Sequence, residues 1–132
     1  MKKLLVCLLL SLLVACEKAP RETFDLVLSK TKGPLVVQVV DLQKPTSGHV
    51  LSAYETVGFF KEMRKIERGD QSYREPRYVF QLYSDTSLKT QVMKIDLDEK
   101  GKGYFEWESN RAGVYFKSEP LVKWAQKCFS TP

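Results

Sequence analysis

Four short strand-like stretches follow one another in the second half of this chain, and they constrain its fold more than any other feature. The first three alternate apolar and polar residues, and the fourth is aromatic. They cover residues 77–83, 91–97, 102–108 and 113–117. Such alternation is typical of strands that bury one face. The connections between them are only a few residues long and rich in turn-forming residues. We therefore expect an antiparallel four-strand meander.

An amphipathic helix is predicted on each side of this meander. Before it, apolar residues recur at helical spacing on one face of about five turns: Val50, Ala53, Tyr54, Val57, Phe60 and Met63. Thr46 or Ser47 is a suitable N-cap for this helix. After the meander, Ser118 caps a helix that carries Leu121, Trp124, Ala125 and Cys128 on one face.

An N-terminal hairpin is predicted before the first helix. Phe24, Leu26 and Leu28 alternate, and the Val-rich segment 35–42 follows a turn at residues 31–34. The fold class is then α+β. It comprises an antiparallel sheet, made of the meander and the hairpin, with two amphipathic helices packed on one face. The length of 132 residues suits a single domain, which we place at residues 24–132.

Residues 1–15 have the build of a secretory signal peptide. Lys2 and Lys3 are followed by an apolar run from Leu4 to Ala15. A helix of this length measures about 18 Å, and a bilayer core is about 30 Å thick, so this run is too short for a stable span.

The segment Leu13-Val14-Ala15-Cys16 resembles a bacterial lipobox. The resemblance implies cleavage before Cys16 and a thioether-linked diacylglycerol on its sulfur, and two acyl chains suffice for stable anchoring. Residues 16–23 would be a lipidated tether, with the domain at the extracytoplasmic face of the cell membrane. The alternative is an ordinary secretory leader with an incidental cysteine. Cys128 would then be available to pair with Cys16, whereas under lipidation a buried and inert thiol is expected.

The charge pattern argues against a nucleic-acid partner. The formal net charge of the chain is +5, and Lys2 and Lys3 supply two of these charges. Acidic residues interrupt the basic stretch that runs from residue 64 to residue 77, and an exported protein does not meet nucleic acid. This stretch and the tyrosines of the short strands are instead candidates for binding a partner. The candidate residues are Arg64, Arg68, Arg74, Arg77, Tyr83, Tyr104 and Tyr115.

Three further patterns suggest a metal site or a catalytic site. Residues 96–101 begin like a calcium-binding loop, but Lys100 and Trp107 occupy ligand positions, so a hairpin turn is favoured. His49 cannot complete a zinc site alone, and nothing in the sequence places it beside Cys128. Glu106 and Glu108 share one strand face, which is the minimum for glycosidase chemistry and also the ordinary pattern of a half-exposed sheet. No catalytic set, cofactor or metal is expected.

Residues 50–128 resemble the YhfM-like lipoproteins of Bacillus. The resemblance is carried by residues 78–82, 93–96 and 103–107 and by the ending Val114 to Glu119. It implies an extracytoplasmic domain of unassigned activity and carries over no catalytic residues. The sequence thus favours a membrane-anchored binding module for a protein or another component of the cell envelope. The alternatives are a small cell-wall hydrolase that uses Glu106 and Glu108, and a structural envelope lipoprotein.

Overall fold

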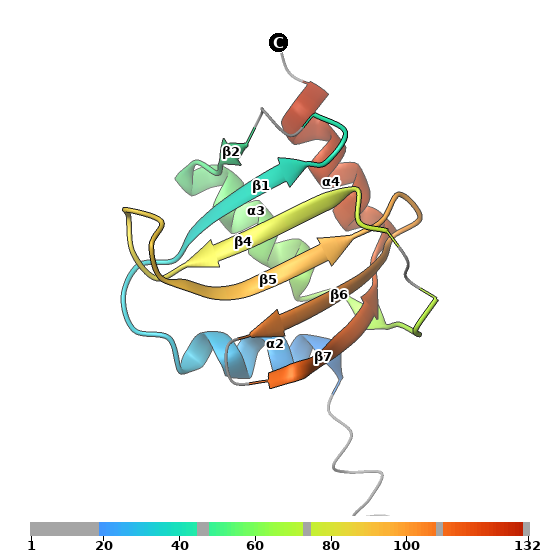
Figure 1. Ribbon diagram of the computed structural model, residues 1–132, viewed down its shortest axis with the longest axis horizontal. Coiled ribbons are helices and arrows are strands. Elements are labelled where there is room, and N and C mark those ends of the chain that lie inside the picture. Colours follow the sequence, from blue (N-terminus) through green and yellow to red (C-terminus); the bar gives the residue numbers. More distant parts are fainter. Residues whose placement is uncertain (1–18, 45–47, 73–74, 108–109, 131–132) are drawn as a thin grey trace, which may run out of the picture.

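An antiparallel sheet forms one layer of the protein, and helices form the other (Figure 1). The computed structural model describes residues 19–44, 48–72, 75–107 and 110–130. In these residues seven strands lie in the order β2-β1-β4-β5-β6-β7-β3. The strands are β1 (Val36–Asp41), β2 (His49–Val50), β3 (Glu67–Arg68), β4 (Tyr78–Tyr83), β5 (Gln91–Leu97), β6 (Lys102–Trp107) and β7 (Asn110–Lys117). The predicted α+β class is confirmed.

The four-strand meander is also confirmed, as β4 to β7. Each of these strands pairs antiparallel with the next one in sequence. At the turn between β5 and β6, one carboxylate oxygen of Asp98 accepts hydrogen bonds from the backbone N–H groups of Lys100 and Lys102. Gly101 supplies the positive φ of 91°. The loop that began like a calcium site is therefore a hairpin turn.

The predicted N-terminal hairpin is wrong, because residues 20–29 form a helix. Helix α2 (Pro20–Ser29) starts on a proline, whose fixed φ suits the first helical turn. Phe24 is 1% exposed and packs its ring 6.1 Å from Phe60 and 6.2 Å from Phe105. Strand β1 therefore pairs with β2 and β4 instead. The buried Pro20 belongs to the fold, although it was assigned to the tether.

Helix α3 (Ala53–Met63) is shorter than the predicted five turns. His49 and Val50 belong to β2, and the helix is capped by Ser52, whose hydroxyl accepts from the Glu55 N–H while the Glu55 side chain accepts from the Ser52 N–H. The caps proposed at Thr46 and Ser47 lie outside the described residues.

The buried face of α3 differs from the predicted one. Met63 is fully buried and Phe60 packs against the core, as predicted, but Tyr54 and Val57 are 89% and 69% exposed. Phe59, which was not on the predicted face, is fully buried. The Phe59 ring stacks on Phe80 of β4 at 4.9 Å. Burying the large Phe59 ring and the Met63 side chain removes more apolar surface from water than burying Tyr54 and Val57 would, and this sets the rotation of the helix.

Helix α4 (Glu119–Ser130) confirms the second predicted helix. The Ser118 hydroxyl caps it by accepting from the Leu121 N–H at 3.1 Å. Leu121 and Ala125 are buried, and Trp124 packs against the core.

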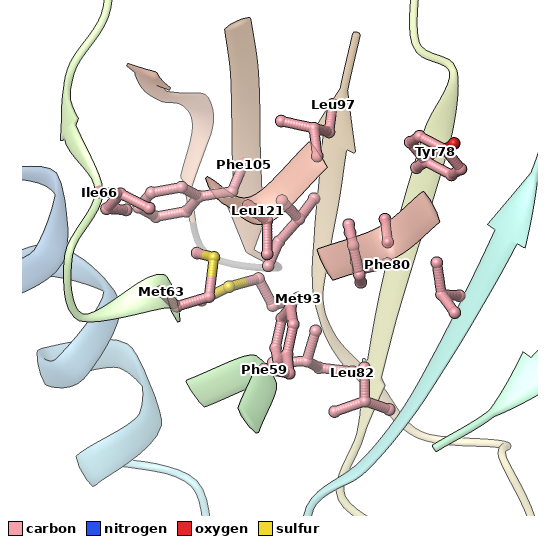
Figure 2. Close-up of a cluster of buried hydrophobic side chains, with 14 of the residues drawn as sticks. Phe59, Met63, Ile66, Tyr78, Phe80, Leu82, Met93, Leu97, Phe105 and Leu121 are labelled. Atoms are coloured by element: carbon pink, nitrogen blue, oxygen red, sulfur yellow. The ribbon is translucent and has the colours of Figure 1, made fainter. Parts of the chain in front are cut away.

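The core lies between the sheet and the described helices, as Figure 2 shows for side chains of α3, α4 and strands β4 to β6. Along β5, Met93, Ile95 and Leu97 point into it, while the residues between them are only half-buried. Helices α2, α3 and α4 all contribute to this one core, so none of these three covers the opposite face of the sheet (Figure 1). We call that opposite surface the open face.

Candidate binding surfaces

Strand register builds a continuous row of side chains across the open face. Val40 pairs with Val79, Val79 with Asp96, Asp96 with Tyr104, and Tyr104 with Tyr115. These five residues alternate with core residues along their strands, so they project from the face that the described helices leave open. Val79 is nevertheless buried, at 8% exposed, and the other four side chains are half-buried. The row places two valines at one end and two tyrosines at the other, with one carboxylate between them.

The tyrosine end of this row is packed onto backbone. The rings of Tyr104 and Tyr115 lie 4.9 Å apart. Tyr104 also covers Gly113, where an added Cβ would stand only 2.2 Å from the Tyr104 ring. Gly113 has a φ of +62°, which favours glycine. Burial raises the pKa of Tyr104, and Glu106 raises it further, so the phenol stays neutral at physiological pH.

A second row on the open face is polar. Gln38 pairs with Gln81, Gln81 with Lys94, and Lys94 with Glu106. The Lys94 ammonium also lies 3.9 Å from the Asp96 carboxylate. Glu106 thus faces a cation across the strands, and its predicted catalytic companion Glu108 lies outside the described residues.

The three predicted tyrosines share the open face. Tyr83 lies four residues along β4 from Val79, and four residues of strand measure about 13 Å. It is half-buried and distant from the pair formed by Tyr104 and Tyr115. Of the three predicted tyrosines, Tyr104 and Tyr115 lie together, and Tyr83 lies apart from them.

Arg77 has a structural role. Its guanidinium donates from Nε to Asp41 Oδ1 at 2.7 Å and from Nη2 to Asp41 Oδ2 at 3.2 Å, and from Nη1 to Glu99 at 2.5 Å. The charge of Arg77 is therefore paired within the fold, whereas the sequence suggested that it binds a partner. Arg77 lines a hollow of about 720 Å³ between the loops at one end of the sheet. Its predicted companion Arg74 lies outside the described residues.

Arg64 and Arg68 lie on a different surface, beside the start of α2. Ala19, Pro20 and Arg21 face residues 64–68 across a hollow of about 390 Å³. We call it the basic hollow, because four of its lining residues are cationic: Arg21, Arg64, Lys65 and Arg68. The sequence did not suggest Arg21, since its segment was assigned to a tether.

The outer side of the helical layer carries an apolar groove of about 440 Å³. Tyr54 and Val57 of α3 line it together with Trp124 and Cys128 of α4. Gly58 permits the close approach of the helices, because an added Cβ would stand 3.0 Å from the Trp124 ring nitrogen. Exposed apolar side chains grouped in this way are a second candidate surface.

His49, Glu55 and Cys128 meet at one end of this groove. His49 Nε2 lies 2.9 and 3.0 Å from the two carboxylate oxygens of Glu55. The Cys128 thiol is hydrogen-bonded to the same carboxylate, and burial, followed by the charge of Glu55, raises the pKa of that thiol to about 11. Glu55 thus stands between the histidine and the thiol. This order keeps Cys128 protonated, whereas a nucleophile needs the thiolate.

The described part of the chain contains no candidate metal cluster and no candidate membrane-spanning helix. Its His, Cys, Asp and Glu residues form no cluster of three or more that could hold a metal ion. None of its helices has the length and apolar character needed to cross a bilayer.

Comparison with known proteins identifies a related fold. No family model and no curated protein matches this chain. A crystal structure described as a "putative lipoprotein" from Clostridium perfringens matches with a TM-score of 0.60. The match covers 84% of this chain and 93% of that chain at 13% identity. At this identity the likeness shows a shared fold.

Proposed function

We propose that the chain is an envelope lipoprotein, anchored by lipid on Cys16 at the extracytoplasmic face of the cell membrane. Two independent observations support this proposal. The leader has the charge, the apolar run and the lipobox-like Leu13 to Cys16 of a lipoprotein signal. The structural neighbour from Clostridium perfringens carries a lipoprotein description. Cys16 itself lies outside the described residues.

The anchor is tested by the intact mass of the protein extracted from membranes. We expect the mass of residues 16–132 plus a diacylglycerol group or a further acylated form of it. A Cys16→Ala variant should lack the lipid and remain uncleaved. An unmodified mature mass for the wild type would contradict the anchor and point to a freely secreted domain.

The domain itself acts as a binding module for a protein partner, and its open face makes the contact. The observation that carries this proposal is the Tyr104–Tyr115 pair, fixed over Gly113 at one end of the row that Asp96 interrupts. Tyrosine supplies a large contact area with little entropy to lose, and Tyr104 is already held by packing. The charged residues Lys94, Asp96 and Glu106 lie beside the Tyr104–Tyr115 pair, and charged residues around an aromatic contact are an arrangement found at protein interfaces.

Site-specific photo-crosslinking in cells tests the binding surface. A photoreactive residue at position 115 should give one defined adduct, and the same probe at Lys123 on α4 should give none. The adduct should be lost when Tyr104→Ala is added.

The probe is also placed at Tyr54, in the groove between α3 and α4, which is the competing surface. An adduct from position 54 alone would move the binding site to that groove and overturn the assignment to the open face. Adducts of equal yield from all three positions would indicate random collision and would also overturn it.

A further inference from the structure

We propose that the basic hollow beside α2 lies against the membrane surface and binds the phosphate groups of anionic lipid headgroups. This inference rests on the proposed anchor at Cys16, and it adds the orientation of the domain and the lipid class that it contacts. Among the described residues that line the hollow, four are cationic and only Glu67 is acidic.

The place of the hollow along the chain puts it next to the membrane. Ala19 lines the hollow, and Cys16 precedes it by three residues. Whatever path those residues take, three residues reach at most about 11 Å. The electrostatic attraction of an anionic surface decays over about 8 Å at physiological ionic strength. A lipid on Cys16 therefore holds the rim of the hollow within about one and a half decay lengths of the headgroups, where their attraction for cations is reduced but still present.

The charge of the hollow suits phosphate. The side chains of Arg21, Arg64, Lys65 and Arg68 are all exposed. Arginine presents a planar fork of N–H donors that matches phosphate oxygens. The Glu67 carboxylate lies 3.6 Å from the Lys117 ammonium, which offsets part of its repulsion toward an anion.

The backbone that carries these cations is fixed by the core. Ile66 is buried between the exposed Lys65 and Glu67. Arg68 pairs with Phe116 in the register of β3 and β7. On the other side, Phe24 holds α2 against the same core. The cations therefore stand on a preformed surface, which loses little backbone entropy when it meets a membrane.

A lysine footprint on the full-length lipidated protein tests the orientation. The protein is reconstituted into vesicles of phosphatidylcholine alone or with about a third of phosphatidylglycerol. Headgroups that bind the hollow would shield the Lys65 ammonium, so we expect acetylation of Lys65 to be several-fold slower in the anionic vesicles than in the neutral ones. Acetylation of Lys123, on α4, should not change. Salt at about 1 M should remove the difference.

Charge-matched variants separate the hollow from net charge. Arg64→Gln with Arg68→Gln should abolish the protection of Lys65. Lys89→Gln with Lys100→Gln removes the same charge elsewhere and should leave the protection intact. Equal unfolding midpoints would establish that both variants fold. Equal acetylation of Lys65 in both vesicle types, or slowing of both lysines together, would overturn the inference. Protection of Lys65 by millimolar glycerol phosphate in neutral vesicles would indicate a small-anion site and would also overturn it.

The intact mass of the same sample keeps the two proposals apart. If the diacylglycerol is absent, the anchor fails. Sedimentation of that unlipidated protein with anionic vesicles, compared with neutral ones, then tests the hollow on its own. Binding that requires Arg64 and Arg68 would support it, and equal sedimentation with both vesicle types would reject it.

Discussion

Arg77 and Asp41 form a two-pronged ion pair that ties the end of β1 to the start of β4. Both prongs are short enough for charge-assisted hydrogen bonds, at 2.7 and 3.2 Å. Asp41 is 2% exposed, so its charge depends on this partner. Asp41 also accepts the backbone N–H of Gln43, which shapes the turn that follows β1.

Arg77→Gln is expected to lower the free energy of unfolding by about 3 kcal/mol, because it leaves a buried carboxylate without its counter-charge. Urea denaturation measures the change. Lys100→Gln, which lines the same hollow, is the control and should stay within about 0.5 kcal/mol of the wild type. Asp41→Asn combined with Arg77→Gln should cost less than the two single changes added together. Full additivity would show that the pair is not coupled.

The same pair predicts a loss of stability in acid. The hydrogen bonds from Arg77 hold the pKa of Asp41 below its usual value of 3.8. A carboxyl whose pKa is lower in the folded state contributes its full stability above the unfolded value and loses it as the pH falls through the folded value. Unfolding free energies between pH 7 and pH 3 should therefore fall more steeply below about pH 4 for the wild type than for Asp41→Asn. Parallel curves would contradict this assignment.

Gly113→Ala is expected to destabilise the protein by about 1–2 kcal/mol, because alanine at a positive φ is strained. The new methyl group also meets the Tyr104 ring. Adding Tyr104→Ala should remove the steric part of the cost and leave the backbone part, which a thermodynamic cycle of the four proteins resolves. A fully additive cycle would mean that Tyr104 does not pack on Gly113.

The rotation of α3 is tested by a pair of truncations. Phe59→Ala should cost about 3–5 kcal/mol, since it opens a cavity against Phe80. Val57→Ala, two residues earlier, should cost less than about 0.5 kcal/mol, because Val57 faces solvent. Chemical denaturation measures the free energy of unfolding of both variants. A larger loss for Val57→Ala than for Phe59→Ala would favour the helical face expected from the sequence.

Cys128 should be slow toward alkylating reagents. With a thiol pKa of about 11, only about one molecule in a thousand carries the thiolate at pH 8. Iodoacetamide labelling of the Cys128 peptide, followed by mass spectrometry from pH 7 to pH 11, should rise throughout that range. Glu55→Gln removes one cause of the raised pKa and should shift the curve to lower pH. A plateau below pH 9 in the wild type would contradict the assignment.

The meander and α4 were predictable because their signals are local. Alternation along β4 to β6 and the cap at Ser118 need no distant partner to be recognised. Residues 20–29 were not, since Phe24, Leu26 and Leu28 fit a strand while Phe24, Val27 and Leu28 fit a helix. The contacts of Phe24 with Phe60 and Phe105 decide between them, and such contacts cannot be read from a short window.

The candidate sites divide in the same way. Tyr104 and Tyr115 could be named as candidates because each lies on a short aromatic strand, whereas their contact across β6 and β7 is not visible in the sequence. The ion-pair partner of Arg77 is Asp41, at the end of another strand. The sequence around Arg77 does not indicate this pairing, because the two residues are far apart along the chain. Arg21 joins Arg64 only because α2 docks beside β3, so the basic hollow became visible in three dimensions alone.

The docking of α2 has a consequence for the order in which the protein can fold. The first described helix packs against β7, the last strand (Figure 1). Its Phe24 ring lies 6.2 Å from that of Phe105. An emerging chain can therefore offer Phe24 its contact with Phe60 early, but it cannot offer the contacts with Phe105 and β7 until most of its length has been synthesised. A polypeptide that completes its core only at the end stays open while it is being made. Under the export that we propose, this delay would keep the chain open until it has passed through a translocation channel.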